Sequence, residues 1–98
     1  MTVRLGVLAL LEARSDKGDE LAAFLENGRS IAAAEPGTVT WYAFRINDTN
    51  YGIFDTFGTE EARQAHIDGE IPKALANVGS ELLARDPDIR TVEVVAVK

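Results

Sequence analysis

The chain has 98 residues, which is enough for one domain with a single modest hydrophobic core. Its 10 lysines and arginines stand against 16 aspartates and glutamates, and the net charge of −6 argues against nucleic acid or an anionic membrane as a partner, because both need a broad positive surface. The absence of cysteine excludes disulfides, thiolate chemistry and cysteine-ligated metals.

The first predicted element is a strand from Val3 to Glu12, a run rich in valine, leucine and alanine. Both of its faces are apolar, since Leu8 and Leu10 alternate with the other hydrophobic residues. Such a strand needs cover on both faces. The chain's own helices can cover one face, and we expect a partner subunit to cover the other. Met1 to Arg4 lack the features of a secretory leader, so we expect a cytoplasmic protein.

A helix is predicted after the turn Ser15–Gly18. Asp19 and Glu20 fall in its first turn, where acidic side chains favour the helix dipole, and apolar residues then recur in three- and four-residue steps. These residues are Leu21, Phe24, Leu25, Gly28, Ile31 and Ala32. Gly28 marks either close packing or a break, and Pro36–Gly37 ends the helix.

Two strands, Thr38 to Ile46 and Tyr51 to Phe57, are predicted to form a hairpin around the polar turn Asn47–Asn50. If Asn47 faces Asn50, Tyr42 lies opposite Asp55. That register places the following side chains on one face of the hairpin: Tyr42, Phe44, Ile53, Asp55 and Phe57.

A short helix is predicted after the hairpin. Thr59 is a suitable N-cap, and Glu60 and Glu61 in the first turn favour the helix dipole. The helix carries His66, the only histidine of the chain, and Asp68–Gly69 supplies its stop signal.

The last two predicted elements are a helix and a strand. The helix has Pro72 in its first turn, and Gly79 could divide it. Its apolar stripe consists of Ile71, Ala74, Leu75, Val78 and Leu82. After a loop at Asp86–Asp88, we expect a strand from Thr91 to Val97.

These elements follow the order β-α-β-β-α-α-β in a single domain, residues 1–98. The order is typical of an α+β, ferredoxin-like fold, in which a four-stranded antiparallel sheet has helices on one face. Two such sheets that pack face to face in a dimeric α/β barrel would hide the uncovered face. We therefore expect a homodimer.

The segment from Tyr51 to His66 carries a family resemblance. It has an acidic residue, Asp55, an aromatic residue two places later, Phe57, and His66 nine places after that. With this spacing, the chain resembles the antibiotic biosynthesis monooxygenase superfamily of dimeric α+β barrels along essentially its whole length. Pro36–Gly37 before a strand that holds a tryptophan is also similar to that family.

The resemblance implies a cofactor-free monooxygenase that acts on a small aromatic or quinol-like compound. The alternative is a non-catalytic ligand-binding or structural dimer of the same fold. The superfamily also includes an isomerase and haem-degrading enzymes. The haem degraders use an asparagine on the first strand, where this chain has Gly6 and Val7, so haem degradation is less expected. Isomerase activity is also less expected than monooxygenase activity. No flavin or haem motif is present, and we expect no cofactor.

His66 and Asp55 are the candidate catalytic residues. His66 is the one side chain whose ordinary pKa lies near neutrality, so it could accept a phenolic proton, although a buried histidine with a purely structural hydrogen bond remains the alternative. Asp55 interrupts an apolar strand and needs a partner if it is buried. It could orient His66, or it could accept a hydrogen bond from Tyr42 or from the backbone.

The candidate substrate-binding residues are the aromatic side chains Trp41, Tyr42, Phe44 and Phe57, which could equally be core. Arg45 and Asn47 could donate hydrogen bonds to an oxyanion, or serve the turn and the solvated surface. We expect no metal site, because one histidine and no cysteine make a poor transition-metal site and no acidic loop has calcium spacing.

Overall fold

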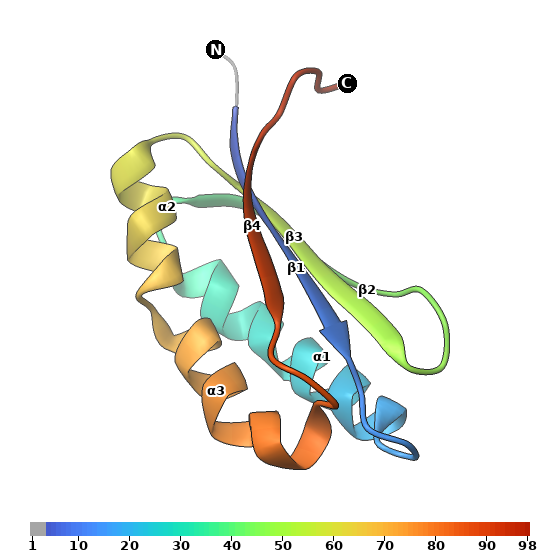
Figure 1. Ribbon diagram of the computed structural model, residues 1–98. Helices are drawn as coiled ribbons and strands as arrows, with labels where there is room; N and C mark the ends of the chain where they lie inside the picture. Colours follow the sequence, from blue (N-terminus) through green and yellow to red (C-terminus); the bar gives the residue numbers. More distant parts are fainter. Residues whose placement is uncertain (1–3) are drawn as a thin grey trace.

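A computed structural model describes residues 4–98, so Val3 of the first predicted strand lies outside the described residues. The elements are β1 (Leu5–Glu12), α1 (Gly18–Ala34), β2 (Thr38–Arg45), β3 (Asn50–Phe57), α2 (Glu60–Ile67), α3 (Glu70–Leu82) and β4 (Asp88–Glu93). The strands form one antiparallel sheet in the order β2-β3-β1-β4, and the helices all lie on one of its faces (Figure 1). The predicted element order and the α+β, ferredoxin-like class are confirmed.

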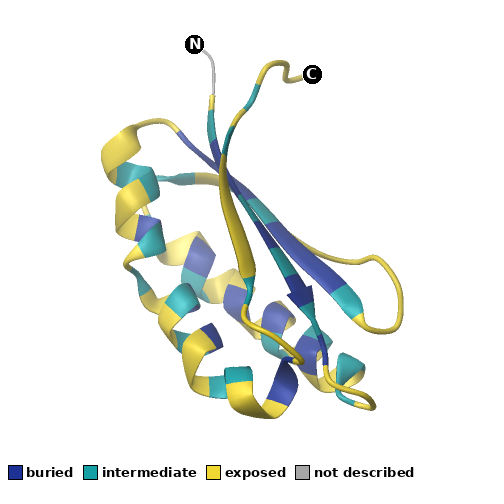
Figure 2. Ribbon diagram, in the orientation of Figure 1, coloured by how far each residue is buried: buried dark blue, intermediate teal, exposed yellow. Residues whose placement is uncertain are grey.

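The hydrophobic core fills the space between the sheet and the helices. The central strands β1 and β3 contribute alternate residues, and the helices contribute the sides that face the sheet, which are dark blue in Figure 2. The most deeply buried apolar side chains are Leu11, Leu21, Tyr51 and Phe57. Within residues 4–98, no helix has the length and hydrophobicity needed to cross a bilayer.

Gly28 and Gly79, each of which could have interrupted a predicted helix, lie inside unbroken helices. Gly28 faces Trp41, and a Cβ added there would lie 3.4 Å from the indole ring, so this glycine marks close packing of α1 on β2. Gly79 does not divide α3. The predicted N-cap of α2 is confirmed, because the Thr59 hydroxyl accepts a hydrogen bond of 3.1 Å from the amide of Ala62.

The predicted hairpin register is wrong by one residue. Tyr42 lies opposite Phe54, and Trp41 lies opposite Asp55. The reason is the side chain of Asn47, whose Oδ1 accepts hydrogen bonds from the amides of Thr49 and Asn50 at 3.0 and 2.8 Å. The amides of Ile46 and Asn47 both donate to the carbonyl of Asn50, at 2.8 and 3.3 Å, and Ile46 makes the shorter bond.

This shift exchanges the residues that share a face with Asp55. Because opposite residues of an antiparallel pair point to the same side, Trp41 joins Asp55 on the helix-covered face, and Tyr42 and Phe44 point to the other face. An irregularity between Thr38 and Thr40 shifts the register once more, so that Thr38 pairs with Phe57.

The predicted last strand is also placed too late in the chain. β4 begins at Asp88 and ends at Glu93, whereas the sequence predicted Thr91 to Val97. Its limits follow those of its partner, since Asp88 pairs with Leu10 and Glu93 pairs with Leu5. Beyond Glu93, Val95 and Val97 are exposed and extend past the sheet.

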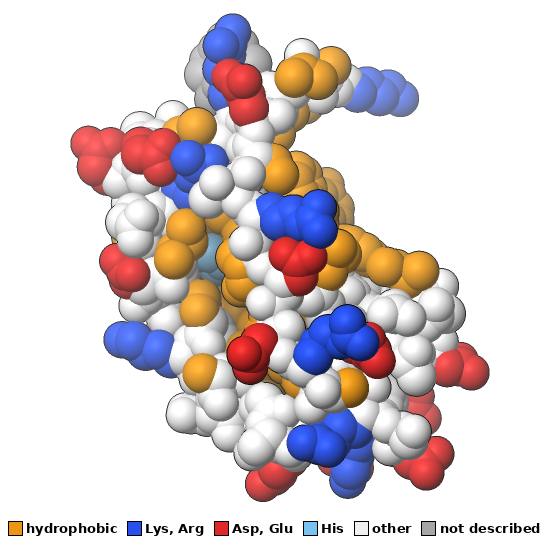
Figure 3. All heavy atoms as spheres, in the orientation of Figure 1, with side chains coloured by type: hydrophobic (Ala, Val, Ile, Leu, Met, Phe, Trp, Pro, Cys, Tyr) orange, Lys and Arg blue, Asp and Glu red, His pale blue; other side chains and the backbone are white. Residues whose placement is uncertain are grey.

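The face of the sheet opposite the helices carries exposed hydrophobic side chains. Tyr42 is 61% exposed and Ile46 is 59% exposed, and Phe44 lies between them on the same side of β2. Figure 3 shows hydrophobic side chains gathered along the side of the molecule away from the helices, and charged groups of both signs over the rest of this view. We call this surface the outer face.

Candidate functional site

His66 lies in the last turn of α2 and points into the molecule. Its side chain is 6% exposed, although the helix that carries it is mostly polar. It packs against Phe57 of β3, with ring centroids 5.2 Å apart and planes tilted by 42°. The Thr59 cap and the stop at Asp68 set the length and start of α2, and so decide that position 66 faces the sheet.

Each ring nitrogen of His66 meets a carboxylate from a different element. Nε2 lies 2.8 Å from Oδ2 of Asp55 on β3, and Nδ1 lies 2.7 Å from Oε1 of Glu35 at the end of α1. Thr38 at the start of β2 donates its hydroxyl to the same Glu35 oxygen at 2.7 Å. We call Glu35, His66 and Asp55 the carboxylate–histidine array.

The contact between His66 and Asp55 is short but poorly aligned. Asp55 is 1% exposed, and within the described residues neither of its carboxylate oxygens has a well-aligned hydrogen bond, even though Oδ2 is 2.8 Å from the imidazole. A buried carboxylate without neutral donors depends on a nearby positive charge. The contact is therefore best described as an ion pair between the Asp55 carboxylate and the His66 imidazolium.

The surroundings raise the pKa of His66 above its ordinary value of 6.5. Burial is the largest single influence and lowers the pKa, but the hydrogen bonds and charges of Asp55 and Glu35 together outweigh it. The cause is geometric, because a neutral imidazole would turn one unprotonated nitrogen toward a carboxylate, whereas the imidazolium turns an N–H group and its positive charge toward both.

Glu35 is the member of the array that was not among the catalytic residues predicted from the sequence. It is the C-cap residue of α1, directly before Pro36–Gly37. A sequence signal was available, because a carboxylate at the C-terminal end of a helix opposes the helix dipole and so calls for a compensating partner. That partner, His66, lies 31 residues away, and local sequence could not identify it.

An unfilled cavity of about 640 Å³ borders the array. The end of α1 and the start of β2 form one side of it, and α2 and the start of α3 form the other. Glu35, Thr38 and His66 line it together with small apolar residues such as Ala62 and Ala65. Its volume lies within the range of about 300–1,000 Å³ that is usual for small-molecule sites.

The four predicted substrate-binding residues do not gather at this cavity. Trp41, Tyr42 and Phe44 line a groove of about 470 Å³ between α1 and the edge strand β2. Phe57 is completely buried and packs on His66. Among the described residues that border the 640 Å³ cavity, none is one of these four.

The two candidate oxyanion donors serve local structure. Arg45 forms an ion pair of 3.2 Å with Asp19 and lies over the ring of Tyr51, with its guanidinium carbon 5.2 Å from the centroid. Asn47 uses its side-chain oxygen to hold the hairpin turn. Within residues 4–98, no group of three or more His, Cys, Asp or Glu side chains is arranged to hold a metal ion.

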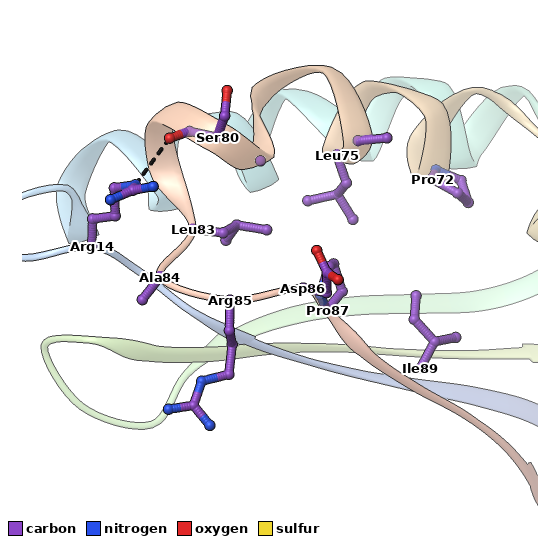
Figure 4. Close-up of a pocket in the computed structure, with 12 residues that line it drawn as sticks. Arg14, Pro72, Leu75, Ser80, Leu83, Ala84, Arg85, Asp86, Pro87 and Ile89 are labelled. Atoms are coloured by element: carbon purple, nitrogen blue, oxygen red, sulfur yellow. Dashed lines mark hydrogen bonds between the residues drawn. The ribbon is translucent and has the colours of Figure 1, made fainter.

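A further cavity of about 550 Å³ lies between α3 and β4, away from the array (Figure 4). Leu75 and Leu83 face Ile89 across it, and Arg14 donates a hydrogen bond of 2.9 Å to the carbonyl of Ser80 at one end. Its lining includes no member of the carboxylate–histidine array among the described residues.

Comparison with solved structures places this fold beside several bacterial proteins. A protein of unknown function from Nitrosomonas europaea is 38% identical, with a TM-score of 0.95 over 98% of this chain and 93% of that chain. A second N. europaea protein, named "putative antibiotic biosynthesis monooxygenase", is 11% identical with a TM-score of 0.82 over 94% and 99% of the two chains. A protein of the same name from Caulobacter crescentus is 23% identical with a TM-score of 0.78 over 96% and 92%. No family model and no curated protein matches the chain.

Proposed function

We propose that this chain, which shares its fold with proteins named putative antibiotic biosynthesis monooxygenase, is a cofactor-free monooxygenase acting on a small aromatic or quinol-like compound. The main observation that supports the proposal is that the carboxylate–histidine array borders an unfilled cavity of the size usual for small-molecule sites. The substrate would bind in that cavity, between the end of α1 and α2.

The proposed reaction requires few functional groups from the protein. An electron-rich phenol that loses its hydroxyl proton in a site shielded from water can pass an electron directly to O₂. One oxygen atom of O₂ then enters the ring and the other leaves as water, so that the phenol becomes a quinone and the substrate itself supplies the electrons. The protein has to provide a proton acceptor, hydrogen-bond donors and exclusion of bulk water.

His66 and Asp55 are the proposed catalytic residues, with Glu35 as the third member of their array. Phe57 would hold the imidazole ring in place, because it packs directly on it. The other predicted substrate-binding residues, Trp41, Tyr42 and Phe44, line the groove beside β2 and not this cavity, so we propose no contact between them and this substrate.

Oxygen uptake with a panel of phenols and quinols tests the proposal. We expect the wild type to consume O₂ and His66→Ala to lose at least about 100-fold in rate, the lower end of the usual effect of disabling proton transfer, because Asp55 and Glu35 lose the partner that lies between them. Gln64→Ala, an exposed change on the same helix, is the matched control and should keep the wild-type rate. Equal rates in the wild type and His66→Ala would remove His66 from the mechanism.

A second candidate function is a non-catalytic, ligand-binding or structural dimer. One observation favours it: both nitrogens of the nearly buried His66 are already engaged, so this residue could simply join α1, α2 and β3. In that case no compound of the panel would drive oxygen uptake, and His66→Ala would change only the free energy of unfolding.

We also propose that the protein is a homodimer of the cytoplasm, in which the outer faces of two subunits pack against each other. The exposed aromatic and aliphatic side chains of β2 support this arrangement, because water-exposed apolar patches of this kind commonly mark interaction surfaces.

A further inference from the structure

Glu35 is the member of the array that a ligand in the cavity can reach most easily. Its side chain is 23% exposed, whereas those of His66 and Asp55 are 6% and 2% exposed. It also lies where α1 ends and the chain turns into β2, at the rim of the 640 Å³ cavity. A ligand that enters this cavity therefore meets the carboxylate of Glu35 before it meets Asp55.

The two oxygens of Glu35 have different surroundings. Oε1 accepts from both His66 Nδ1 and Thr38 Oγ1, each at 2.7 Å. Within the described residues, Oε2 takes part in no hydrogen bond, and it lies 3.6 Å from the place a Cβ on Gly69 would occupy. Oε2 is thus a carboxylate oxygen with unused acceptor capacity at the cavity wall.

His66 offers no such acceptor. Both of its nitrogens are turned toward carboxylates, so no imidazole lone pair faces the cavity. When His66 is protonated it carries one positive charge between two carboxylates. The array as a whole then has a charge of −1, and the oxygen that faces the cavity belongs to Glu35.

Carboxylates outnumber cations around the cavity, since protonated His66 is the one positive side chain among the described residues that line it. Besides Glu35, the charged side chains that line it in the described chain are Glu61 and Glu70, and no lysine or arginine is among them. A carboxylate or phosphate ligand would be repelled by these groups, whereas a neutral ligand with a hydroxyl donor would not. The small apolar residues between them suit an apolar ligand body.

We propose that Glu35, through Oε2, binds the hydroxyl group of a neutral phenol and receives its proton. The inference rests on the proposed function and names the substrate class and the proton acceptor for it. In the step, the phenol O–H bond breaks and an O–H bond to Oε2 forms, while His66 keeps both ring protons. The array changes from −1 to neutral and the substrate from neutral to −1, so charge balances.

Calorimetric binding without O₂ tests the first half of the proposal. We expect wild type to bind 2-naphthol about tenfold or more tightly than 2-methoxynaphthalene, because a hydrogen bond to a charged group is worth about one power of ten or more. Glu35→Gln should lose this preference, and Glu81→Gln, the same change at an exposed position of α3, should keep it. A preference that survives in folded Glu35→Gln overturns the proposal.

Two further measurements keep the proposal testable if Glu35→Gln does not fold. In the wild type, 6-hydroxy-2-naphthoate should bind about tenfold or more weakly than 2-naphthol, and equal affinities would contradict the assigned substrate class. Glu35→Asp keeps the charge but shortens the side chain, so we expect it to retain part of the preference for 2-naphthol, and complete loss would contradict a role for the charge.

Oxygen uptake separates this proposal from the proposed function. If wild type oxidises a phenol and Glu35→Gln lowers kcat together with kcat/KM, the proton-acceptor role is supported. If His66→Ala abolishes oxidation and Glu35→Gln does not, Glu35 is not the acceptor and the monooxygenase proposal survives. If no phenol is oxidised but Glu35→Gln loses its binding preference, the monooxygenase proposal fails together with proton transfer, and the hydroxyl-binding role of Glu35 stands.

Discussion

His66 is buried in surroundings that favour its protonated form. Burial by itself would lower the pKa of this imidazole, and the neighbouring Asp55 and Glu35 reverse that effect. The same contacts join α1, α2 and β3, because each member of the array comes from a different element. The contacts that would prepare His66 for catalysis therefore also stabilise the fold.

The contacts of His66 with the two carboxylates predict how the free energy of unfolding depends on pH. Since the folded-state pKa of His66 is raised above its unfolded value of 6.5, its stabilising contribution is complete below about pH 6.5 and is lost as the pH rises through the folded-state pKa. We expect the free energy of unfolding, measured by urea denaturation between pH 6 and 9, to fall with rising pH more steeply in the wild type than in His66→Gln. Parallel pH profiles would show that the charge of His66 contributes nothing.

At the scale of the element, α2 positions the histidine and depends on close contacts made by its first half. Arg63 reaches back to the sheet and donates to the carbonyls of Gly6 and Val92, each at 3.3 Å. Ala62 packs against Gly37, at the point where the chain enters β2. This close approach of α2 to the start of β2 requires that position 37 has no side chain.

A pair of glycine substitutions tests this packing. In Gly37→Ala, the added methyl group would lie 2.4 Å from the Cβ and 3.3 Å from the Cα of Ala62, so α2 must move. We expect a loss of about 1–3 kcal/mol in the free energy of unfolding, as for other overpacked sites. Gly58→Ala is the matched control, because a Cβ there has no neighbour within 4 Å and neither glycine has a positive φ. Equal stabilities of the two variants would contradict the contact.

On the scale of the whole molecule, the sheet has one covered and one uncovered face. The helices cover one side of the sheet (Figure 1). Asp55 lies on that side, and the outer face displays Tyr42, Phe44 and Ile46 to solvent. Apolar side chains on both sides of a sheet are stable in water only with cover on both sides. A second copy of the chain is the partner that we propose for the outer face.

Sedimentation tests the proposed dimer. We expect wild type to sediment as a dimer at micromolar concentration and Tyr42→Glu to sediment as a folded monomer, because dimerisation would bury an unpaired carboxylate. Ala23→Glu places the same charge on the exposed side of α1 and should leave the dimer intact. A well-folded wild-type monomer at this concentration would contradict the proposal.

The amino-acid sequence by itself determined the element order, the fold class and the Thr59 cap of α2, because these depend on periodicity and on side chains within a few residues of each other. Only the tertiary structure decided the hairpin register, which depends on three-dimensional hydrogen bonds of the Asn47 side chain. It also decided that Glu35 joins His66 across 31 residues, and that Tyr42 and Phe44 face away from Asp55. Such pairings depend on how distant segments pack, and a one-residue shift in a strand reverses every side chain without changing the local pattern.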